Sequence, residues 1–369
     1  MTAPPAPWPG DPLGTTDACP PPPPPARAEP DARDADDATV RERLDAAVRA
    51  VDAPDVVFAL SRHGHRTVRS AGTAPPPPAG RTGLRYEIGS ASKTFTGLLF
   101  ARLTGSGALS GGEPAAPLLD PGRPAARHPV TLAHLITHTS GLPALPPGFL
   151  LGALPAWRTN PYAGYPAERV VDAFLRHRPR HRPGTRWHYS NFAVAVLGHA
   201  LAAATATPWE ELLTAEVLRP LGLSGVALHA GDAVSDATGH RRDGTTRTPP
   251  LAVGGFQAAG AVRATPQDLL AFLEAHLDPA GSPLAGALRT VRRPVLRRGL
   301  GHRHTHTVAW FQHPTARGPM YFHCGATLGQ QAFLGFHPGT GTALAAVCTR
   351  RFRARDAFVP TAYALLADA

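Results

Sequence analysis

Hydrophobic patterns of two kinds follow one another along this chain, and their order limits the fold. The N-terminal part combines one helical pattern with strand patterns on either side of the polar turn at 63–65. In order, the predicted elements are a helix over 39–51, hairpin strands over 55–62 and 66–72, an extended segment over 84–89, and an apolar helix over about 90–103.

Helical patterns then dominate, and strand patterns return near the C-terminal end. Several of the helical patterns begin with Thr, Asn or Pro, which favour helix starts. The clearest helical patterns cover 130–138, 168–177, 191–205, 208–222 and 265–277. The later patterns are strands over 305–313, 318–325, 330–337 and 341–349, and a final helix over 361–367.

This order predicts an α/β (α+β) fold, in which an antiparallel sheet is flanked by N- and C-terminal helices and carries an inserted all-helical subdomain. Residues 1–37 read as a disordered, proline-rich tail, because they lack apolar side chains that could build a core. We expect a discontinuous α/β domain over 38–105 and 291–369, a helical insertion over 106–290, and a catalytic cleft between them.

Arginine supplies nearly all of the positive charge. The 37 basic residues include a single lysine, Lys93, and against 27 acidic residues they give a net charge of +10. The densest basic stretch, 176–186, is broken by prolines and has no interleaved aromatic residues. We therefore expect a solvated loop there and no nucleic-acid partner.

The cysteines and the N-terminal residues exclude other classes. Cys19, Cys324 and Cys348 are odd in number and widely spaced, which argues against a disulfide framework and against a cysteine zinc site. No apolar run approaches the roughly 20 residues of a membrane helix, and no signal peptide is visible. The expectation is a soluble, cytoplasmic protein with no cofactor, no metal and no membrane partner.

Ser90 and Lys93 stand three residues apart at the start of the apolar helix, so one helical turn brings them to the same face. Burial beside a helix N-terminus disfavours the charged form of an amine, which would let Lys93 accept a proton. Arginine stays protonated and lacks this ability. The backbone N–H of Ser90 is also suited to stabilising an oxyanion.

Two further motifs carry chemistry. Tyr189 can serve as a base or proton shuttle near a lysine, and Asn191 can orient a substrate; alternatively, Ser190 or Asn191 merely caps the next helix. His323-Cys324-Gly325-Ala326 lies at a strand end. There the glycine would let a substrate backbone approach, and the N–H of Ala326 would be a second oxyanion donor.

Together these motifs resemble the serine β-lactamase and penicillin-binding protein superfamily, within it the class C β-lactamase, D-alanyl-D-alanine carboxypeptidase and esterase branch. Matching stretches, among them YEIGSASKTFTGLL, LAHLITHTSGLP, PGTRWHYSNFAVAVLGHAL and FHCGATLGQQAFLGFHPGTG, run in family order from about 84 to 349. The resemblance implies Ser90 as acylated nucleophile, Lys93 as base, Tyr189 as proton shuttle, Asn191 as substrate contact, and the N–H groups of Ser90 and Ala326 as oxyanion hole.

One departure bears on the substrate. Where β-lactamases and carboxypeptidases of this family carry Lys-Thr-Gly, this chain has His323-Cys324-Gly325. A histidine with an ordinary pKa near 6.5 offers a substrate carboxylate only part of a positive charge at neutral pH. The sequence therefore predicts a serine hydrolase acting on a small-molecule ester, amide or lactam, with an intracellular acyltransferase and a β-lactam sensor without turnover as alternatives.

The remaining candidate residues have ordinary explanations. His302, His304 and His306 alternate as on one strand face, but no acidic residue accompanies them, so we expect packed or solvated histidines. Cys324 is expected to be a small spacer and Cys348 a core residue.

Overall fold

An antiparallel sheet forms the centre of one half of the molecule. The computed structural model describes residues 30–124, 126–156, 159–179, 181–298 and 304–369, and within them the sheet has eight strands in the order β2-β1-β10-β9-β8-β7-β6-β5. Every neighbouring pair is antiparallel. The strands are β1 Val56–Arg62, β2 His65–Ala71, β5 Pro294–Arg298, β6 His304–Thr307, β7 Phe311–Thr315, β8 Gly318–Ala326, β9 Gln331–His337 and β10 Thr342–Cys348.

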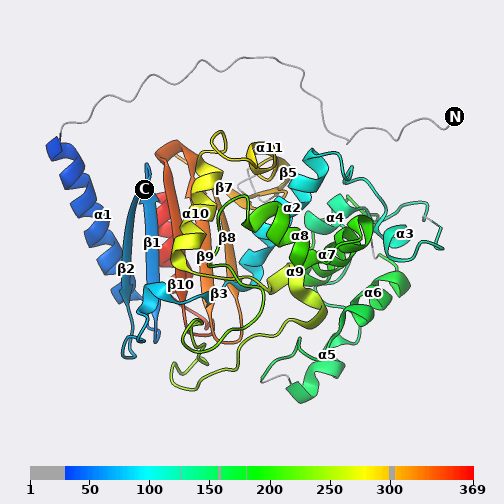
Figure 1. Ribbon diagram of the computed structural model, residues 1–369, viewed down its shortest axis with the longest axis horizontal. Coiled ribbons are helices and arrows are strands. Elements are labelled where there is room, and N and C mark those ends of the chain that lie inside the picture. Colours follow the sequence, from blue (N-terminus) through cyan, green and yellow to red (C-terminus); the bar gives the residue numbers. More distant parts are fainter. Residues whose placement is uncertain (1–29, 125, 157–158, 180, 299–303) are drawn as a thin grey trace, which may run out of the picture.

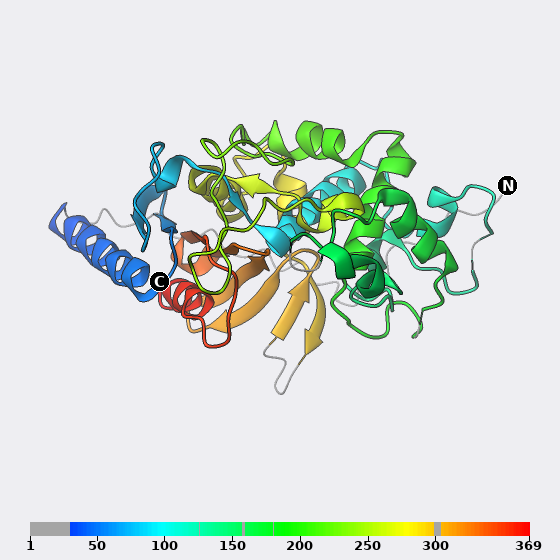
Figure 2. The same ribbon diagram turned by 90° about the horizontal axis from the view of Figure 1, so that it is seen from below.

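Helices cover both faces of this sheet, which explains why its central strands are apolar on both sides. Successive side chains of a strand point to opposite faces, so Phe58 packs toward α1 (Pro30–Ala50) and α12 (Phe358–Ala367), whereas Val57 belongs to the larger core on the other face. Figure 2 shows the blue α1 and the red α12 close together beside the sheet. The mixed α/β fold predicted from the pattern order is confirmed.

The other half of the molecule is helical and is built around α7, which is buried along most of its length (Figure 1). Strands β3 and β4 form a separate two-stranded sheet. The elements are α2 Ser92–Gly105, α3 Ala115–Leu119, α4 Leu132–Ile136, α5 Phe149–Ala153, α6 Ala167–Arg176, α7 Asn191–Thr205, α8 Trp209–Leu213, α9 Gln257–Gly260, α10 Pro266–Leu277, α11 Ala285–Thr290, β3 Tyr86–Glu87 and β4 Arg263–Ala264.

Two helices, α1 and α10, depart from the predicted domain limits. Helix α1 already begins at Pro30, inside the predicted tail 1–37, and a proline suits a first helical turn because its missing N–H would have no helical partner there. Helix α10 falls within the predicted insertion 106–290 yet packs on β1, β9 and β10 of the sheet. Residues 1–29 lie outside the described part of the chain.

One predicted strand is wrong. The stretch 305–313 forms two strands, β6 and β7, because the chain turns back between Thr307 and Trp310. The Thr307 N–H donates to the Trp310 carbonyl at 2.9 Å, and the Thr307 hydroxyl accepts from the Trp310 N–H at 2.9 Å. The turn residues Val308 and Ala309 are buried and apolar, so no polar turn signal interrupts the pattern. Strand β5, which begins with a proline and carries arginines, was not predicted.

No single helix among the described residues has both the length and the apolar composition to span a bilayer; α7 and the following stretch Trp209–Leu218 pass such a test only as a pair bent by 85°.

Candidate active site

Ser90 lies in a tight 3-10 turn, Gly89–Ala91, that links β3 to α2. Ser90 itself is half-buried, and its position places the backbone N–H at the start of a long buried helix. The preceding Gly89 has φ +49°, in the left-handed region that favours glycine. The turn is tied to the helical half, because the Ile88 N–H donates to the Val262 carbonyl at 3.2 Å.

The end of β8 packs directly on this turn. A Cβ placed on Gly325 would lie 1.8 Å from the Ile88 carbonyl oxygen, and one on Gly89 would lie 2.5 Å from the carbonyl oxygen of Ala326. Gly325 therefore has a packing role that the sequence analysis missed, and its predicted role in admitting a substrate backbone stays a prediction. Its missing side chain makes room for the Ser90 turn, and so brings Ala326 beside Ser90.

The backbone of Ala326 faces the same turn. The hairpin after β8 closes with the Thr327 N–H donating to the Gln330 carbonyl at 2.9 Å. Because hydrogen-bonded and non-bonded pairs alternate in an antiparallel ladder, the next pair, Ala326 with Gln331, is non-bonded, and the N–H of Ala326 points away from β9. Strand β7 pairs with β8 as far as Phe322. Beyond Phe322, the edge of β8 that faces away from β9 packs on the Ser90 turn.

Lys93 is buried in the first turn of α2, with 2% of its surface exposed. Its Nζ donates to the carbonyl of Ala259 at 2.9 Å and lies 5.2 Å from the ring centroid of Tyr189. Ala259 in turn lines the same cavity as Ser90. Among the described residues Lys93 forms no ion pair, and its amine faces the Ala259 carbonyl and the Tyr189 ring.

His138, to which the sequence analysis assigned no role, holds Tyr189 from both sides. Its carbonyl accepts the N–H of His188 at 2.8 Å, and its Nδ1 accepts the N–H of Ser190 at 3.2 Å. The His138 and Tyr189 rings lie 4.6 Å apart. His138 adopts φ +58°, rare for a residue with a side chain. The signal was present, since His138 stands inside the family-like stretch LAHLITHTSGLP.

Burial, followed by the charge of Lys93, holds the pKa of His138 well below its usual 6.5. A neutral ring is what the hydrogen bond requires, because Nδ1 accepts only when it carries no proton. His138 therefore has the properties of a fixed support for the Tyr189 backbone.

The predicted partial charge of His323 is wrong. His323 is 4% exposed, and burial, then the charge of Lys93, lowers its pKa to about 3. With Lys93 and His138 it lines a small cavity of about 20 Å³. At neutral pH the imidazole is thus uncharged and offers a substrate carboxylate no positive charge.

This pKa predicts acid sensitivity. An unfolded histidine binds a proton near pH 6.5, but folded His323 does so only near pH 3. Stability therefore falls as pH drops through that window, because the unfolded state binds more protons. We expect His323→Gln to lose less stability between pH 6.5 and 3 than the parent in urea titrations, while its acylation rate keeps the parent's pH profile above pH 5. An unchanged acid loss would contradict the assignment of a neutral, buried His323.

Asn191 and Ser190 have separate tasks. The Ser190 hydroxyl caps α7 by accepting the Ala193 N–H at 2.8 Å, which confirms the capping interpretation for Ser190. Asn191, the first residue of α7, instead lines the cavity that contains Ser90, and its Oδ1 is buried without a hydrogen-bond partner among the described residues. A buried acceptor of this kind usually has a partner, which a bound molecule could supply.

The cavity beside Ser90 has a volume of about 70 Å³ and mostly apolar walls. Sequence reasoning identified Ser90, Asn191 and Ala326, but missed the wall residues, which come from loops and short helices far apart in the chain. The missed wall residues include Tyr162, Leu251, Val253 and Phe256.

Of the other sequence candidates, His306 is buried and packs against an aromatic ring, whereas His304 is exposed. His306 stacks on Trp187 at 4.4 Å between ring centroids, and His304 shares a hydrogen bond of 2.7 Å with His313. The described residues contain no group of three or more side chains arranged to hold a metal; His302 and Cys19 lie outside them. Burial raises the pKa of the Cys324 thiol to about 12, and Cys348 is confirmed as a core residue.

Comparison with known proteins identifies the family. A family model described as Beta-lactamase matches residues 38–369. The chain belongs to the Beta-lactamase family. This membership confirms the resemblance to the serine β-lactamase and penicillin-binding protein superfamily.

Curated relatives within the family have several names. The chain is 26% identical over 258 residues to a beta-lactamase of Lysobacter lactamgenus, covering 69% of this chain and 63% of that protein. It is 28% identical over 196 residues to the D-alanyl-D-alanine-carboxypeptidase/endopeptidase AmpH of Escherichia coli, covering 52% and 48%. It is 31% identical over 217 residues to the esterase EstB of Burkholderia gladioli, covering 54% of each. The chain therefore spans about half to two thirds of the length of these relatives.

Solved structures support the fold. A beta-lactamase/D-alanine carboxypeptidase from Pseudomonas syringae superimposes with a TM-score of 0.74 at 20% identity, over 91% of this chain and 99% of that one. A class C beta lactamase from Rhodobacter sphaeroides gives 0.72 at 21% identity, over 89% and 98%. At this identity the likeness concerns the fold alone.

Proposed function

We propose that this protein is a serine hydrolase that forms an acyl-enzyme at Ser90. The observation that carries the proposal is the close packing of the Ser90 turn on the end of β8 at Gly89 and Gly325, which supports an oxyanion hole because Ser90 and Ala326 line the same cavity. Two N–H groups aimed at one point stabilise the oxyanion of acyl transfer.

The residues behind Ser90 supply proton transfer. Lys93 and Tyr189, 5.2 Å from Nζ to ring centroid, take the Ser90 hydroxyl proton as Oγ bonds to the substrate carbonyl carbon. The tetrahedral oxyanion accepts hydrogen bonds from the N–H groups of Ser90 and Ala326. When the bond to the leaving group breaks, the same proton passes to that group, and a water molecule then hydrolyses the acyl-enzyme and releases the acid.

The substrate class follows from the cavity. Lys93 is the one lysine or arginine among the residues that line the two cavities, and the proposed mechanism uses its amine as the base. His323 is neutral, so no fixed charge remains for a carboxylate next to the scissile bond. The walls favour a neutral ester or amide with an apolar acyl group, and Asn191 Oδ1 is placed to accept an N–H of that substrate. Turnover of penicillins is expected to be weak.

Acyl transfer is the second candidate. Among the described residues, no carboxylate lines the cavity that contains Ser90, and most of its walls are apolar. We infer that water enters such a cavity poorly, so another nucleophile can compete for the acyl-enzyme. The acceptor would be an amine or alcohol. A sensor that is acylated by β-lactams without turnover is the least favoured alternative.

Labelling with a fluorophosphonate, with a β-lactam and with short p-nitrophenyl esters, followed by intact mass over time, tests these alternatives. We expect a stable fluorophosphonate adduct on the parent and none on Ser90→Ala, and rapid loss of the acyl group that the p-nitrophenyl esters leave on the parent. Loss that requires an added amine or alcohol would favour the transferase, and a persistent β-lactam adduct the sensor. Equal labelling of Ser90→Ala and parent would overturn the assignment of the nucleophile.

A further inference from the structure

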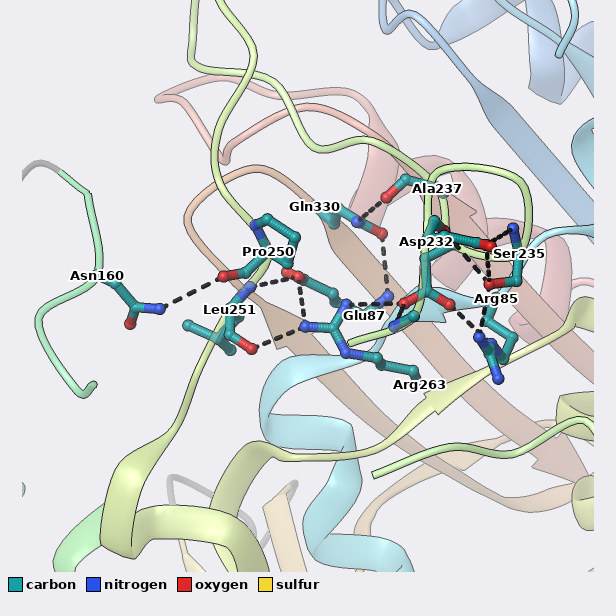
Figure 3. Close-up of polar contacts among 12 residues, drawn as sticks. Arg85, Glu87, Asn160, Asp232, Ser235, Ala237, Pro250, Leu251, Arg263 and Gln330 are labelled. Atoms are coloured by element: carbon teal, nitrogen blue, oxygen red, sulfur yellow. Dashed lines mark hydrogen bonds and ion pairs between the residues drawn. The ribbon is translucent and has the colours of Figure 1, made fainter. Parts of the chain in front are cut away.

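Leu251 is a wall of the Ser90 cavity that belongs to no helix or strand, yet its backbone is firmly held. Its N–H donates to Glu87 Oε1 at 2.7 Å, and its carbonyl accepts from Arg263 Nη2 at 2.7 Å. Figure 3 shows the two side chains meeting at Leu251. Both polar groups of one wall residue are therefore bound by charged side chains, which make stronger hydrogen bonds than neutral partners do.

Glu87 and Arg263 bind each other as well. They are cross-strand neighbours on β3 and β4, their side chains lie 3.0 Å apart, and 7% and 4% of these side chains are exposed. Asp236 lies 3.7 Å from the other nitrogen of Arg263 and is itself paired with Arg85 at 2.7 Å. Both charged side chains of the Glu87–Arg263 pair thus have polar partners in the interior, namely each other, the Leu251 backbone and, for Arg263, Asp236.

Glu87 also contacts the turn that follows Ala326. Glu87 stands three positions before Ser90 in the chain, and its N–H donates to Gln330 Oε1 at 3.0 Å (Figure 3). Gln330 belongs to the turn after Ala326, and its Nε2 donates to the Ala237 carbonyl at 2.8 Å. Glu87 therefore contacts the Gln330 turn through its backbone N–H and the Leu251 wall through its carboxylate, three positions before Ser90.

A buried ion pair is a poor device for stability, because apolar residues of similar volume often serve as well or better. The hydrogen bonds from these charged groups are directional, so they fix the position of the Leu251 segment relative to Ser90. We propose that the Glu87–Arg263 pair is a positioning unit that sets the depth of the acyl cavity through Leu251, so that Ser90 accepts short apolar acyl groups and excludes long ones. This inference rests on the proposed acyl-enzyme function.

The test is a ratio of kcat/KM values for p-nitrophenyl octanoate and p-nitrophenyl acetate. In Glu87→Gln, the weakened hold on Leu251 should move the ratio toward octanoate by about tenfold, the size of effect expected when a pocket wall changes by one or two methylene groups. Leu251→Ala, which shortens the wall and leaves the ion pair intact, should move the ratio in the same direction.

Two further variants separate positioning from general stability. Asp55→Asn weakens a second buried ion pair, Asp55–Arg81 at 2.9 Å, and should leave the ratio within about twofold of the parent. The double variant Glu87→Leu with Arg263→Met removes both charges together; it should keep the thermal midpoint near the parent's and still show the shifted ratio.

An unchanged ratio in Glu87→Gln and in the double variant would overturn the proposal, and so would an unchanged ratio in Leu251→Ala. An equal shift in Asp55→Asn would assign the effect to general loosening and also overturn it. Failure of the proposed function has a different signature, because the parent would then hydrolyse the esters no faster than Ser90→Ala.

Discussion

Lys93→Arg should lose acylation of Ser90 by about 10³-fold, within the range that a general base contributes. The substitution keeps the positive charge, and the cavity of about 20 Å³ beside Lys93 gives the larger head group some room. What it removes is the ability to take the Ser90 proton, because guanidinium stays protonated. The rate of fluorophosphonate labelling, followed by intact mass, measures the loss directly.

Folding has to be checked separately, since Lys93 is 2% exposed. Lys93→Met has similar length and no charge, so it should fold at least as well as Lys93→Arg and lose labelling to a similar degree. Circular dichroism and the thermal midpoint establish that both variants are folded. Labelling of folded Lys93→Arg at a rate close to the parent's would show that Lys93 is not the base.

Gly325→Ala should damage both stability and acylation, although it adds a single methyl group. The new Cβ would lie 1.8 Å from the Ile88 carbonyl oxygen and 2.9 Å from the Ala91 nitrogen. Both atoms belong to the backbone of the Ser90 turn, which has to shift to relieve the overlap. We expect a loss of about 3 kcal/mol in the free energy of unfolding, and a loss of labelling that exceeds any loss of folded protein, because Ser90 moves away from Ala326.

The matched control is Gly105→Ala at the far end of α2, where an added Cβ would meet nothing within 4 Å. There alanine should be neutral or stabilising by about 1 kcal/mol, since it favours helix more than glycine does. Urea unfolding and labelling rates of the two variants give the comparison. If Gly325→Ala labels as fast per folded molecule as the parent, the close packing of β8 on the Ser90 turn does not position the oxyanion hole.

Much of the fold was predictable because its patterns are local. A helix or strand shows its periodicity within a few consecutive residues, so the hairpin of β1 and β2, the long helix after Ser90 and the strands β8 to β10 were found. The failures also have local causes. The sequence predicted one strand in place of β6 and β7 because the turn between them is apolar. Strand β5 was missed because its arginines and its proline weaken the strand pattern.

In the sequence alone, spacing and the single lysine indicated Ser90 and Lys93 as candidate nucleophile and base, and the family resemblance implied Tyr189 as the proton shuttle. Only the tertiary structure decided that Gly325 makes room for the Ser90 turn and that His323 is uncharged. It alone also showed that His138 binds the backbone on both sides of Tyr189, and that Glu87 and Arg263 bind the backbone of Leu251. Close approach, burial and the pKa of a side chain depend on atoms contributed by segments far away in the chain, and no pattern of neighbouring residues records them.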